Sequence, residues 1–345
     1  MSTLTMSVKL KKLSQQTIVI TGASSGIGLV TARMAAKAGA RLILAARSED
    51  ALRQLTSEIR QAGGQADYVV ADVSKPEDVQ RLAQEAASLY GGYDTWINNA
   101  GVSIYGKLEQ VPVEDMRRLF DVNFWGLVNG SLEAAKHLKG KGGAIINVGS
   151  ILSEVTAILQ TIYSASKHAV KGFTDGLRME LEMDEAPISV TLIQPAAIDT
   201  PYPIHAKNFM EREAKHAPPA YAPETVARAI LYAAAHPERD VVVGGGGRAF
   251  IGMNRWTPAL LDQFMEKSFA KQEKADYAPR PLQQNGLDRP MGQLEERGNY
   301  PGSTRETSYY TEAITRGNTG LKAALLVGAG VAAAAWLNGK SSQKK

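Results

Sequence analysis

The sequence predicts an α/β fold: a doubly wound parallel sheet of seven strands with helices on both faces. Between residues 17 and 243, short β-branched runs alternate with longer stretches of helical period, which is the pattern of strand–helix–strand crossovers. The runs 18–20 and 144–146 show almost no polar alternation, as expected for strands covered on both faces. A glycine-rich turn directly follows the first strand, as in sheets that bind ligands at one edge.

The predicted elements follow one another in a regular order. The strands are Thr17–Thr21, Arg41–Ala45, Ala66–Ala71, Asp94–Asn98, Gly143–Val148, Ile188–Ile193 and Asp240–Val243. The Ala- and Leu-rich helices between them are predicted at residues 26–39, 49–62, 76–90, 113–138, 160–183 and 223–236. Because helices separate the strands, the carboxyl ends of all strands meet at one edge of the sheet, where ligands are expected.

Composition limits the class of protein. Of 345 residues, 44% are hydrophobic and 21% are charged, which excludes a disordered chain and a polytopic membrane protein. The absence of cysteine excludes disulfides, thiolate nucleophiles, zinc ribbons and iron–sulfur clusters. The net charge of +4 comes from six basic residues at the two ends, within 9–12 and 340–345. The chain between them has 33 basic and 35 acidic residues. Because this central part of the chain is not basic, no nucleic-acid partner is expected.

The composition of the sequence changes after the seventh predicted strand. The main domain is predicted at 14–250, with a flexible glycine run at 244–247. The segment 251–270 follows, with an amphipathic helix from Ala259 to Ala270 that packs on the domain, on a second subunit, or on a partner or membrane. Residues 271–320 are rich in Pro, Gly and polar residues and predict a largely disordered linker.

The apolar stretch 321–337, interrupted only by Lys322, leaves three roles open. It can be a short membrane anchor, a helix that binds itself or a partner, or a tail without such a role. Residues 1–13 contain no apolar run of signal-peptide length. The domain is therefore expected in the cytoplasm, with membrane contact only through 321–337.

The turn after the first strand predicts a cofactor site. Three glycines at this spacing let the backbone turn tightly, approach a pyrophosphate and start a helix whose free N–H groups point at the anion. The turn lies between an apolar strand and an Ala-rich helix, the context that this motif requires in a Rossmann-type fold; a tight turn without ligand is the alternative. The expected cofactor-binding residues here are Gly22, Ser24, Ser25, Gly26, Ile27 and Gly28.

The end of the second strand bears on which dinucleotide is bound. Folds that choose NAD place a carboxylate there, whereas a basic residue accommodates the additional phosphate of NADP. Here Arg47 and Ser48 follow the strand, and no carboxylate comes before Glu49. NADP(H) is therefore expected, with NAD(H) less favoured; a solvated Arg47 at the start of a helix is the alternative.

Two more turns fall on the same edge of the sheet. Carboxylates and amides there can hold an adenine or shape the wall beside a cofactor, although the two asparagines are otherwise simple turn formers. The candidates after the third and fourth strands are Asp72, Val73, Asn98, Asn99, Ala100 and Gly101.

Ser150 and the run from Tyr163 to Lys167 indicate a reaction. Residues four apart share one face of a helix, so the Lys167 ammonium and the Tyr163 phenol can converge. A nearby positive charge favours phenolate and lowers a tyrosine pKa from about 10 toward the useful range for proton transfer. Ser150 ends the fifth strand and would hydrogen-bond the reacting oxygen, while Asn123 could complete a polar relay.

Together, these motifs resemble those of the short-chain dehydrogenase/reductases over roughly residues 14–250. The resemblance implies that Tyr163 is the general acid/base and that Lys167 binds the nicotinamide ribose and lowers the tyrosine pKa. It also implies that Ser150 orients the carbonyl or alcohol, that Asn123 supports a water-linked proton relay, and that a basic residue at position 47 selects NADP.

The chain departs from the family pattern after the sixth strand. The family usually has Pro-Gly and then a threonine that touches the nicotinamide carboxamide, whereas Ala196 follows Pro195 here. Pro195, Ile198 and Thr200 keep their places and are expected to bind the cofactor. The segment 201–219 resembles the family's substrate lid, and its apolar residues suggest a hydrophobic substrate.

The predicted function is hydride transfer between NADP(H) and a small-molecule carbonyl or alcohol, as in a carbonyl reductase. The alternative is a membrane-tethered dinucleotide-binding sensor or scaffold without catalysis, although such proteins tend to lose the reactive tyrosine or lysine that this chain keeps. No metal site is expected, since the five histidines do not cluster. Family members usually pair through the helices at 113–138 and 160–183, which implies a homodimer or homotetramer. Substrate identity stays open, because the fold and catalytic residues serve many substrates.

Overall fold

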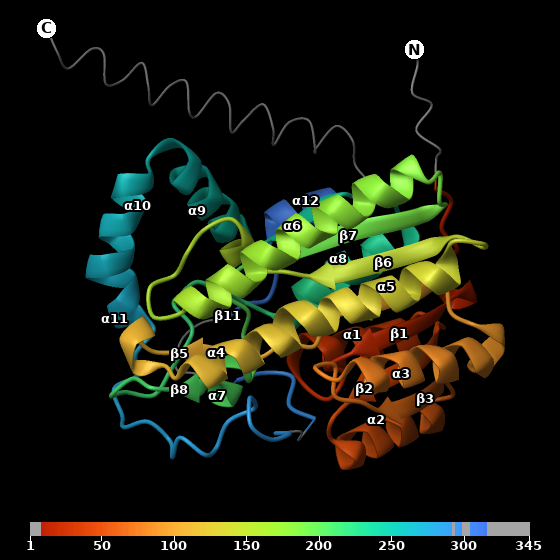
Figure 1. Cartoon of the computed structure of the whole chain (residues 1–345), viewed down its shortest axis with the longest axis horizontal. Coiled ribbons are helices and arrows are strands. Elements are labelled where there is room, and N and C mark those ends of the chain that lie inside the picture. The colour runs from red at the N-terminus through yellow and green to blue at the C-terminus, as the bar shows by residue number, and fades with distance from the viewer. Residues whose placement is uncertain (1–7, 292–293, 299–303, 316–345) are drawn as a thin grey trace, which may run out of the picture.

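The computed structural model describes residues 8–291, 294–298 and 304–315. A sheet of seven parallel strands, in the order β10-β7-β6-β4-β1-β2-β3, forms its centre and has helices on both faces (Figure 1). Its strands are β1 (Thr17–Thr21), β2 (Arg41–Ala46), β3 (Gln65–Val70), β4 (Thr95–Asn98), β6 (Gly143–Val148), β7 (Ile188–Pro195) and β10 (Asp240–Val243). The predicted fold class is confirmed, and each strand agrees with its predicted range to within two residues at either end.

The helices of the sheet domain also follow the predicted order. They are α1 (Gly26–Lys37), α2 (Glu49–Gln61), α3 (Pro76–Ser88), α4 (Val113–Phe120), α5 (Gly126–Leu138), α6 (Thr161–Met183), α7 (Tyr202–His205) and α8 (Pro223–Ala235). The helix predicted at 113–138 is interrupted by a wider π-helical turn at Asp121–Trp125, between α4 and α5. This turn carries Asn123.

Apolar residues of the strands pack on both faces of the sheet. In β1, Ile18 and Ile20 join the core formed with α1, α2 and α8, whereas Val19 joins the core formed with α3, α5 and α6. All three side chains are fully buried. Successive strand residues point to opposite faces, so both faces require apolar residues and the sequence shows no polar alternation.

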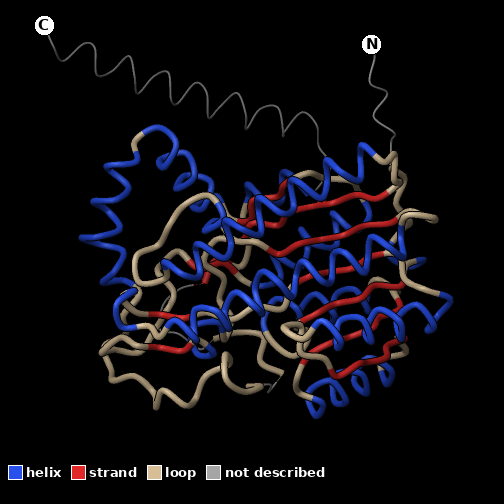
Figure 2. Tube along the Cα trace, viewed as in Figure 1, coloured by secondary structure: helices blue, strands red, loops and turns tan. Residues whose placement is uncertain are grey.

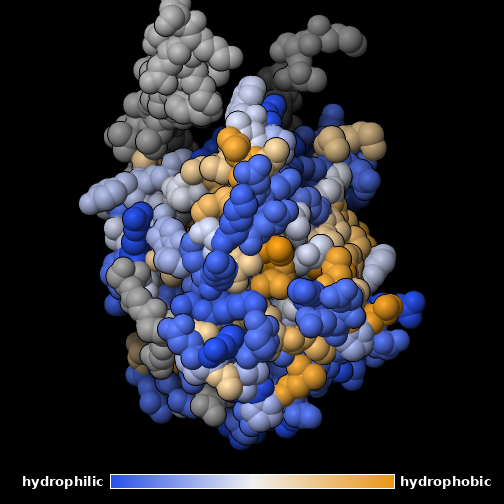
Figure 3. All heavy atoms as spheres, turned by 90° about the vertical axis from the view of Figure 1, so that its left-hand side faces the viewer, coloured by the Kyte–Doolittle hydropathy of each residue, from blue (hydrophilic) through white to orange (hydrophobic). Residues whose placement is uncertain are grey.

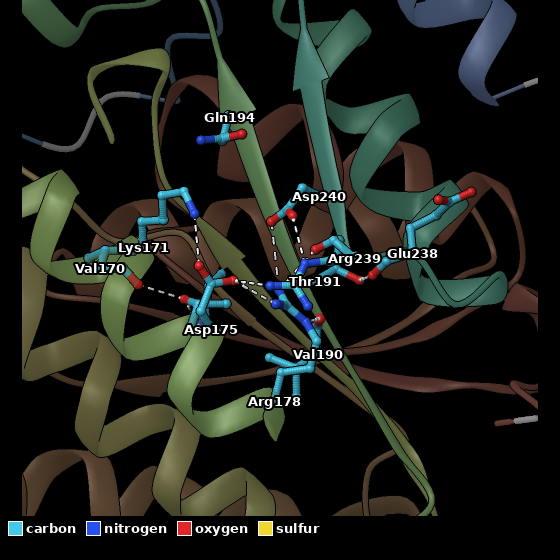
Figure 4. A network of polar contacts seen from close by, with 12 residues as sticks. Val170, Lys171, Asp175, Arg178, Val190, Thr191, Gln194, Glu238, Arg239 and Asp240 are labelled. Atoms are coloured by element: carbon cyan, nitrogen blue, oxygen red, sulfur yellow. Dashed lines mark hydrogen bonds and ion pairs between the residues drawn. The ribbon is translucent and has the colours of Figure 1, made fainter. Parts of the chain in front are cut away.

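An ionic network fastens α6, the helix of Tyr163 and Lys167, to the neighbouring strands (Figure 4). The Asp175 carboxylate lies 2.7 Å from Lys171 Nζ and 2.7 Å from an Arg178 guanidinium nitrogen. Arg178 also donates from Nε to the Val190 carbonyl of β7 at 2.9 Å, and Arg239, directly before β10, reaches Asp175 at 3.0 Å. The position of α6 against the sheet is therefore set by charged as well as apolar contacts.

The C-terminal part of the chain differs from the prediction. Residues 244–247 are not a flexible run, because α9 (Gly245–Trp256) begins there. Two further helices, α10 (Pro258–Phe264) and α11 (Ala270–Gln272), follow and are joined by a π-helical turn at Met265–Phe269. With α9 they form an arch at one side of the molecule (Figure 1), where the Phe250, Phe264 and Phe269 rings pack together.

The segment predicted as a disordered linker, 271–320, is held against the domain wherever it is described. After α11 it runs mostly as loop along the side of α7 (Figure 2), with α12 (Tyr309–Thr315) at its end. Within this segment, β11 (Thr304–Arg305) pairs with β9 (Ala220–Tyr221). A second short pair, β5 (Ile104–Tyr105) with β8 (Lys207–Asn208), joins two neighbouring loops. The prediction was wrong for these residues because backbone groups and charges hold the segment together with a few aliphatic side chains. Gly286 N donates to the His205 carbonyl at 2.6 Å, Lys207 pairs with Asp288 at 3.2 Å, and Leu287 is fully buried in the core.

The surface on the side of the arch carries apolar patches separated by hydrophilic residues (Figure 3). Trp256, at the end of α9, is 80% exposed. Within the described ranges, no helix is both long and apolar enough to cross a bilayer. The stretch 321–337 lies outside the described residues.

Candidate active site

The glycine turn between β1 and α1 is shaped by close backbone approaches. Gly22 and Gly26 have φ angles of +67° and +50°, in the left-handed region that favours glycine. At Gly28, a Cβ atom would lie 2.1 Å from the Gly22 carbonyl oxygen, so only glycine fits. Gly22 and Gly26 are therefore favoured by their backbone conformation, and Gly28 is required by a contact that leaves no room for a side chain.

Asn99 fixes this turn from the end of β4. Its side-chain Nδ2 donates to the carbonyls of Thr21 and Gly22 at 3.0 and 3.1 Å. The neighbouring Asn98 points the other way, into the core, where its Nδ2 donates to Ser131 and Asn147 at 2.9 Å each. One of the two asparagines thus serves the turn and the other serves the packing between β4, α5 and β6.

A groove lies along this edge of the sheet. Most of the predicted cofactor residues line it: Gly22, Ser24, Ser25, Gly26, Ile27, Arg47, Ser48, Asp72, Val73, Asn99, Ala100, Gly101 and Thr200. Gly28 supports the turn from below, while Pro195 and Ile198 line an adjoining cavity. The structure therefore brings residues from four successive strand ends to one site.

The C-terminal segment forms the outer wall of the groove through Gly286, Pro290 and Met291. The Arg47 guanidinium donates to the carbonyls of Gly286, Leu287 and Arg289, the last two at 3.5 and 3.4 Å. Burial lowers the pKa of Arg47, and the nearby Asp72 opposes that shift.

The same segment reaches the start of α1. Gly26 N donates to the Glu295 carbonyl at 2.8 Å, so one of the N–H groups expected to face an anion is bonded within the chain. The sequence pattern gave no sign of this wall, because backbone carbonyls form its contacts.

A cavity adjoins the groove and is lined by Ser150, Tyr163 and Lys167. The two hollows share wall residues, among them Gly101, Thr200 and Tyr202. A ligand in the groove and a second one in the cavity can therefore meet beside Tyr163.

Tyr163 is buried, and burial raises its pKa to about 12, with hydrogen bonds from Tyr202 and Ser150 acting the other way. The expected lowering of this pKa by Lys167 is not found. Lys167 Nζ lies 5.7 Å from the centre of the Tyr163 ring and donates to the Val148 carbonyl at 2.9 Å. Desolvation is the largest cause of the shift, so Tyr163 is a neutral phenol at pH 7.

Lys167 and Ser150 are held from the end of β6. Burial lowers the pKa of Lys167 to about 8, so most of the ammonium stays charged at neutral pH. Ser150 caps a single helical turn, and its Oγ accepts a hydrogen bond from Leu152 N at 3.1 Å. Because that backbone N–H occupies one lone pair of the hydroxyl, the hydroxyl hydrogen is available to Tyr163 or to a bound oxygen.

Asn123 lies behind the reaction centre. Its Oδ1 accepts from Val102 N at 2.8 Å, and its Nδ2 donates to the Val102 carbonyl at 3.0 Å and to Ser166 Oγ at 3.2 Å. These bonds fasten the loop after β4 to α6. A Cβ at Gly101 would lie 3.4 Å from Asn123 Oδ1 and 3.9 Å from Lys167 Nζ, so the asparagine and the lysine approach the same glycine.

The sequence pattern missed two polar residues of the cavity, Gln160 and Glu273. The Tyr202 hydroxyl lies 2.7 Å from Ser103 Oγ and 2.9 Å from Gln160 Oε1. Gln160 in turn bonds Glu273, which lies at the end of α11. Tyr202 belongs to the predicted lid, whereas nothing in the spacing pointed to Gln160 or Glu273.

His216 also lines the cavity and stacks on Tyr202 with ring centres 5.9 Å apart. Burial lowers its pKa to about 4, so it is neutral at pH 7. In the part of the chain that the structure describes, no group of three or more His, Asp or Glu residues could hold a metal ion.

This chain is similar to proteins of one known family. A family model described as short chain dehydrogenase matches residues 16–210. The uncharacterized oxidoreductase YxnA of Bacillus subtilis is 47% identical over 312 residues, which cover 90% of this chain and 88% of that protein.

Two solved structures are similar in fold. A short-chain dehydrogenase/reductase from Burkholderia phymatum, in complex with NAD, has a TM-score of 0.66 and 26% identity, covering 73% of this chain and 96% of its own. An alcohol dehydrogenase from Thermococcus sibiricus, complexed with 5-hydroxy-NADP, has a TM-score of 0.59 and 25% identity, covering 66% and 95%. With the family match over more than half of the sequence, these similarities show that the chain belongs to the short-chain dehydrogenase/reductases and is an oxidoreductase of that family.

Proposed function

We propose that the protein is an NADP(H)-dependent carbonyl reductase, interconverting a carbonyl and an alcohol. One observation carries the proposal: Ser150, Tyr163 and Lys167 line a cavity that continues into the glycine-lined groove. The alternative, a sensor or scaffold without catalysis, has no use for a buried tyrosine, serine and lysine beside such a groove.

The groove fits a dinucleotide. Its floor is backbone that a Cβ atom would fill, since a side chain at Gly22 would lie 2.8 Å from the Ala100 Cα atom. Gly22, Ser24, Ser25 and Ile27 would hold the pyrophosphate, while Asp72 lies where an adenine can be bound. When bound, the nicotinamide supplies or accepts the hydride.

Arg47 and Ser48 support NADP(H) over NAD(H). Both line the groove at the end of β2, where an NAD-binding fold would have a carboxylate. The guanidinium can bind the 2′-phosphate by charge-assisted hydrogen bonds, in exchange for part of its contact with the C-terminal segment. Among the similar structures, one is an NAD complex and one holds an NADP analogue, so the relatives use both.

In the direction of reduction, the substrate oxygen would lie between Ser150 and Tyr163. The Ser150 hydroxyl donates to this oxygen and orients it. The Tyr163 phenol, protonated at neutral pH, gives its proton to the oxygen as charge develops there. The Lys167 ammonium stabilises the resulting phenolate, and Asn123 keeps the loop after β4 against α6 while the proton is replaced.

A homo-oligomer is also expected. Large apolar side chains are exposed along α5 and α6, where family members pair: Leu132, Met179 and Met183. Light scattering of the purified protein would measure the state directly.

The test of the proposed reaction is Tyr163→Phe. Removal of the hydroxyl should lower kcat for carbonyl reduction by roughly 10²-fold or more, because proton transfer is lost. The affinity for NADPH, measured by fluorescence titration, should stay within about threefold, a change under 1 kcal/mol.

Tyr309→Phe is the matched control, since Tyr309 is exposed on α12, and its kinetics should equal those of the parent protein. Normal turnover by Tyr163→Phe would refute the assignment of Tyr163 as the proton donor. Tight cofactor binding by the parent protein without turnover of any carbonyl or alcohol would favour the sensor.

A further inference from the structure

One carboxyl group in the substrate cavity has no role in the reaction described above. Glu273 directly follows α11, well beyond the part of the chain that the family model matches. Its side chain lines the same cavity as Ser150 and Tyr163, yet the residue is only 2% exposed.

The two oxygens of this carboxyl group differ. Gln160 Nε2 donates to Glu273 Oε1. Glu273 Oε2 is buried and has no hydrogen-bond partner among the described residues. A buried polar atom without a partner costs roughly 1–3 kcal/mol, so a ligand atom that bonds to Oε2 recovers that free energy.

The orientation of Gln160 is set from the reaction centre. Its Oε1 lies 2.9 Å from the Tyr202 hydroxyl, which can donate to it, so Nε2 is turned toward Glu273. Tyr202 is in turn hydrogen-bonded to Tyr163. Glu273 is therefore connected to the catalytic tyrosine through Gln160 and Tyr202, and it lies at a separate position on the cavity wall.

The rest of the wall near Glu273 is largely apolar. Phe250, Phe269 and Leu152 line the cavity together with the Pro218–Pro219 pair. Burial raises the pKa of Glu273 to about 8, with the Gln160 bond opposing the shift. At pH 7 most of the carboxyl group carries a proton, and since Oε1 already accepts from Gln160, that proton belongs on Oε2.

We propose that Glu273 determines substrate specificity, with its Oε2 hydrogen-bonding a second oxygen, remote from the reacting carbon, of an otherwise apolar and uncharged substrate. A hydroxyl suits this position, because it can accept from the protonated carboxyl group and donate to the ionised one. A substrate carboxylate does not, because it would meet an acidic side chain in an apolar wall. This inference rests on the proposed carbonyl reduction and adds the substrate class to it.

The test uses two series of straight-chain methyl ketones of increasing length. One series ends in a hydroxyl and the other in a methyl group of similar size, and each pair gives a ratio of kcat/KM values with NADPH. For at least one length, the hydroxyl-to-methyl ratio of the parent protein should exceed that of Glu273→Leu by about tenfold, since one hydrogen bond is worth roughly 1.4 kcal/mol. The methyl-ended ketones should be reduced as well by Glu273→Leu as by the parent protein, which a merely structural role would not give.

Two further variants sharpen the test. Glu273→Gln keeps a donor at the position of Oε2 and should keep most of the preference, whereas Glu273→Ala should lose it and replaces the Leu variant if that one does not fold. Glu213→Gln is the matched control: Glu213 is also buried, but its Oε2 accepts from Arg280 N at 2.7 Å, and its ratio should not change.

The outcomes separate the two proposals. Equal ratios in the parent protein and Glu273→Leu at every length would overturn the role of Glu273, while turnover of the methyl-ended series would still support carbonyl reduction. Lack of turnover of every ketone with both NADPH and NADH would overturn the proposed function, and the role of Glu273 with it.

Discussion

The groove and the cavity adjoin each other and share part of their wall, but each also has a part of its own, built from a different segment and by different means. The groove takes most of its wall from residues 22–122, within the range that the family model matches, and its shape depends on backbone at glycines. The cavity takes part of its wall from residues at 216–273, beyond that range. A change in the groove should therefore affect every substrate alike, whereas a change in the cavity should affect some substrates more than others.

The largest effect is expected from Gly28→Ala. The new Cβ would lie 2.1 Å from the Gly22 carbonyl oxygen, and a backbone atom cannot rotate away as a side chain can. Overpacking costs roughly 1–3 kcal/mol, and at this contact about 3 kcal/mol is expected, or roughly a hundredfold in dinucleotide affinity. Calorimetric titration with NADPH and NADH would measure it, and both should weaken together.

Gly176→Ala in α6 is its control. A Cβ there meets no atom within 4 Å, so this variant should bind cofactor normally and gain about 0.5–1 kcal/mol in stability. Normal NADPH binding by Gly28→Ala would show that the turn adjusts more freely than its contacts imply.

A smaller and more selective effect is expected from Arg47→Ser. Loss of a charge-assisted contact to the 2′-phosphate should weaken NADPH binding by roughly tenfold, or about 1.4 kcal/mol. Arg47 also bonds carbonyls of the C-terminal segment, and loosening of that wall would change NADPH and NADH affinity alike. The ratio of the two affinities, measured by fluorescence titration, therefore isolates the phosphate contact; an unchanged ratio would refute the choice of NADP(H).

On the cavity side, Gly247→Ala is the counterpart of the glycine-turn variant. Its Cβ would lie 2.5 Å from Ile151 Cγ2, a side-chain atom that can shift only by rotation about χ1. A cost of about 1–2 kcal/mol is expected, less than at the backbone contact of Gly28. Steady-state kinetics should show KM for a ketone raised by roughly fivefold, or about 1 kcal/mol, with NADPH affinity unchanged. Equal losses in cofactor and ketone binding would mean that a change in the cavity also distorts the groove.

A further effect, which needs no ligand, is a pH dependence of stability. Burial raises the pKa of Glu273 from 4.5 to about 8, so the folded state holds its proton more tightly than the unfolded chain. The contribution is fully present below pH 4.5 and is lost as the pH rises to 8, by about 1.4 kcal/mol per pH unit. Urea unfolding of the parent protein and Glu273→Gln should therefore differ by a changing amount between pH 5 and 8, and by a constant amount above it.

Comparing the two variants at each pH removes the contributions of Lys167 and His216, which titrate in both. Parallel curves throughout would mean that Glu273 is ionised in the folded protein.

The fold and the groove could be predicted because their signals are local. The strands show as apolar runs, and Gly22, Gly26 and Gly28 are required by φ angles and contacts that leave no room for another residue. The run from Tyr163 to Lys167 is a spacing on one helix, so the sequence alone brings the two side chains to one face.

The rest depends on contacts between distant segments. A glutamate at the end of an amphipathic helix resembles a surface residue, and only the docked arch buries Glu273 against Gln160. The pKa of Tyr163 is governed by burial that no spacing reveals. The segment after α11 resembled a linker because few aliphatic residues hold it, whereas its carbonyls bond Arg47 and Gly26.

The contact between Gln160 and Glu273 closes a separation of 113 residues along the chain. Synthesis proceeds from the N-terminus, so the glycine turn, Asn99 and Tyr163 leave the ribosome well before α11 is made. Contacts of such long range also form late in folding, because a large loop must close before they stabilise anything. The glycine turn of the groove is therefore made before the polar end of the cavity. The chain from α11 onward completes both sites: Glu273 closes the cavity, and Gly286, Pro290 and Met291 form the outer wall of the groove.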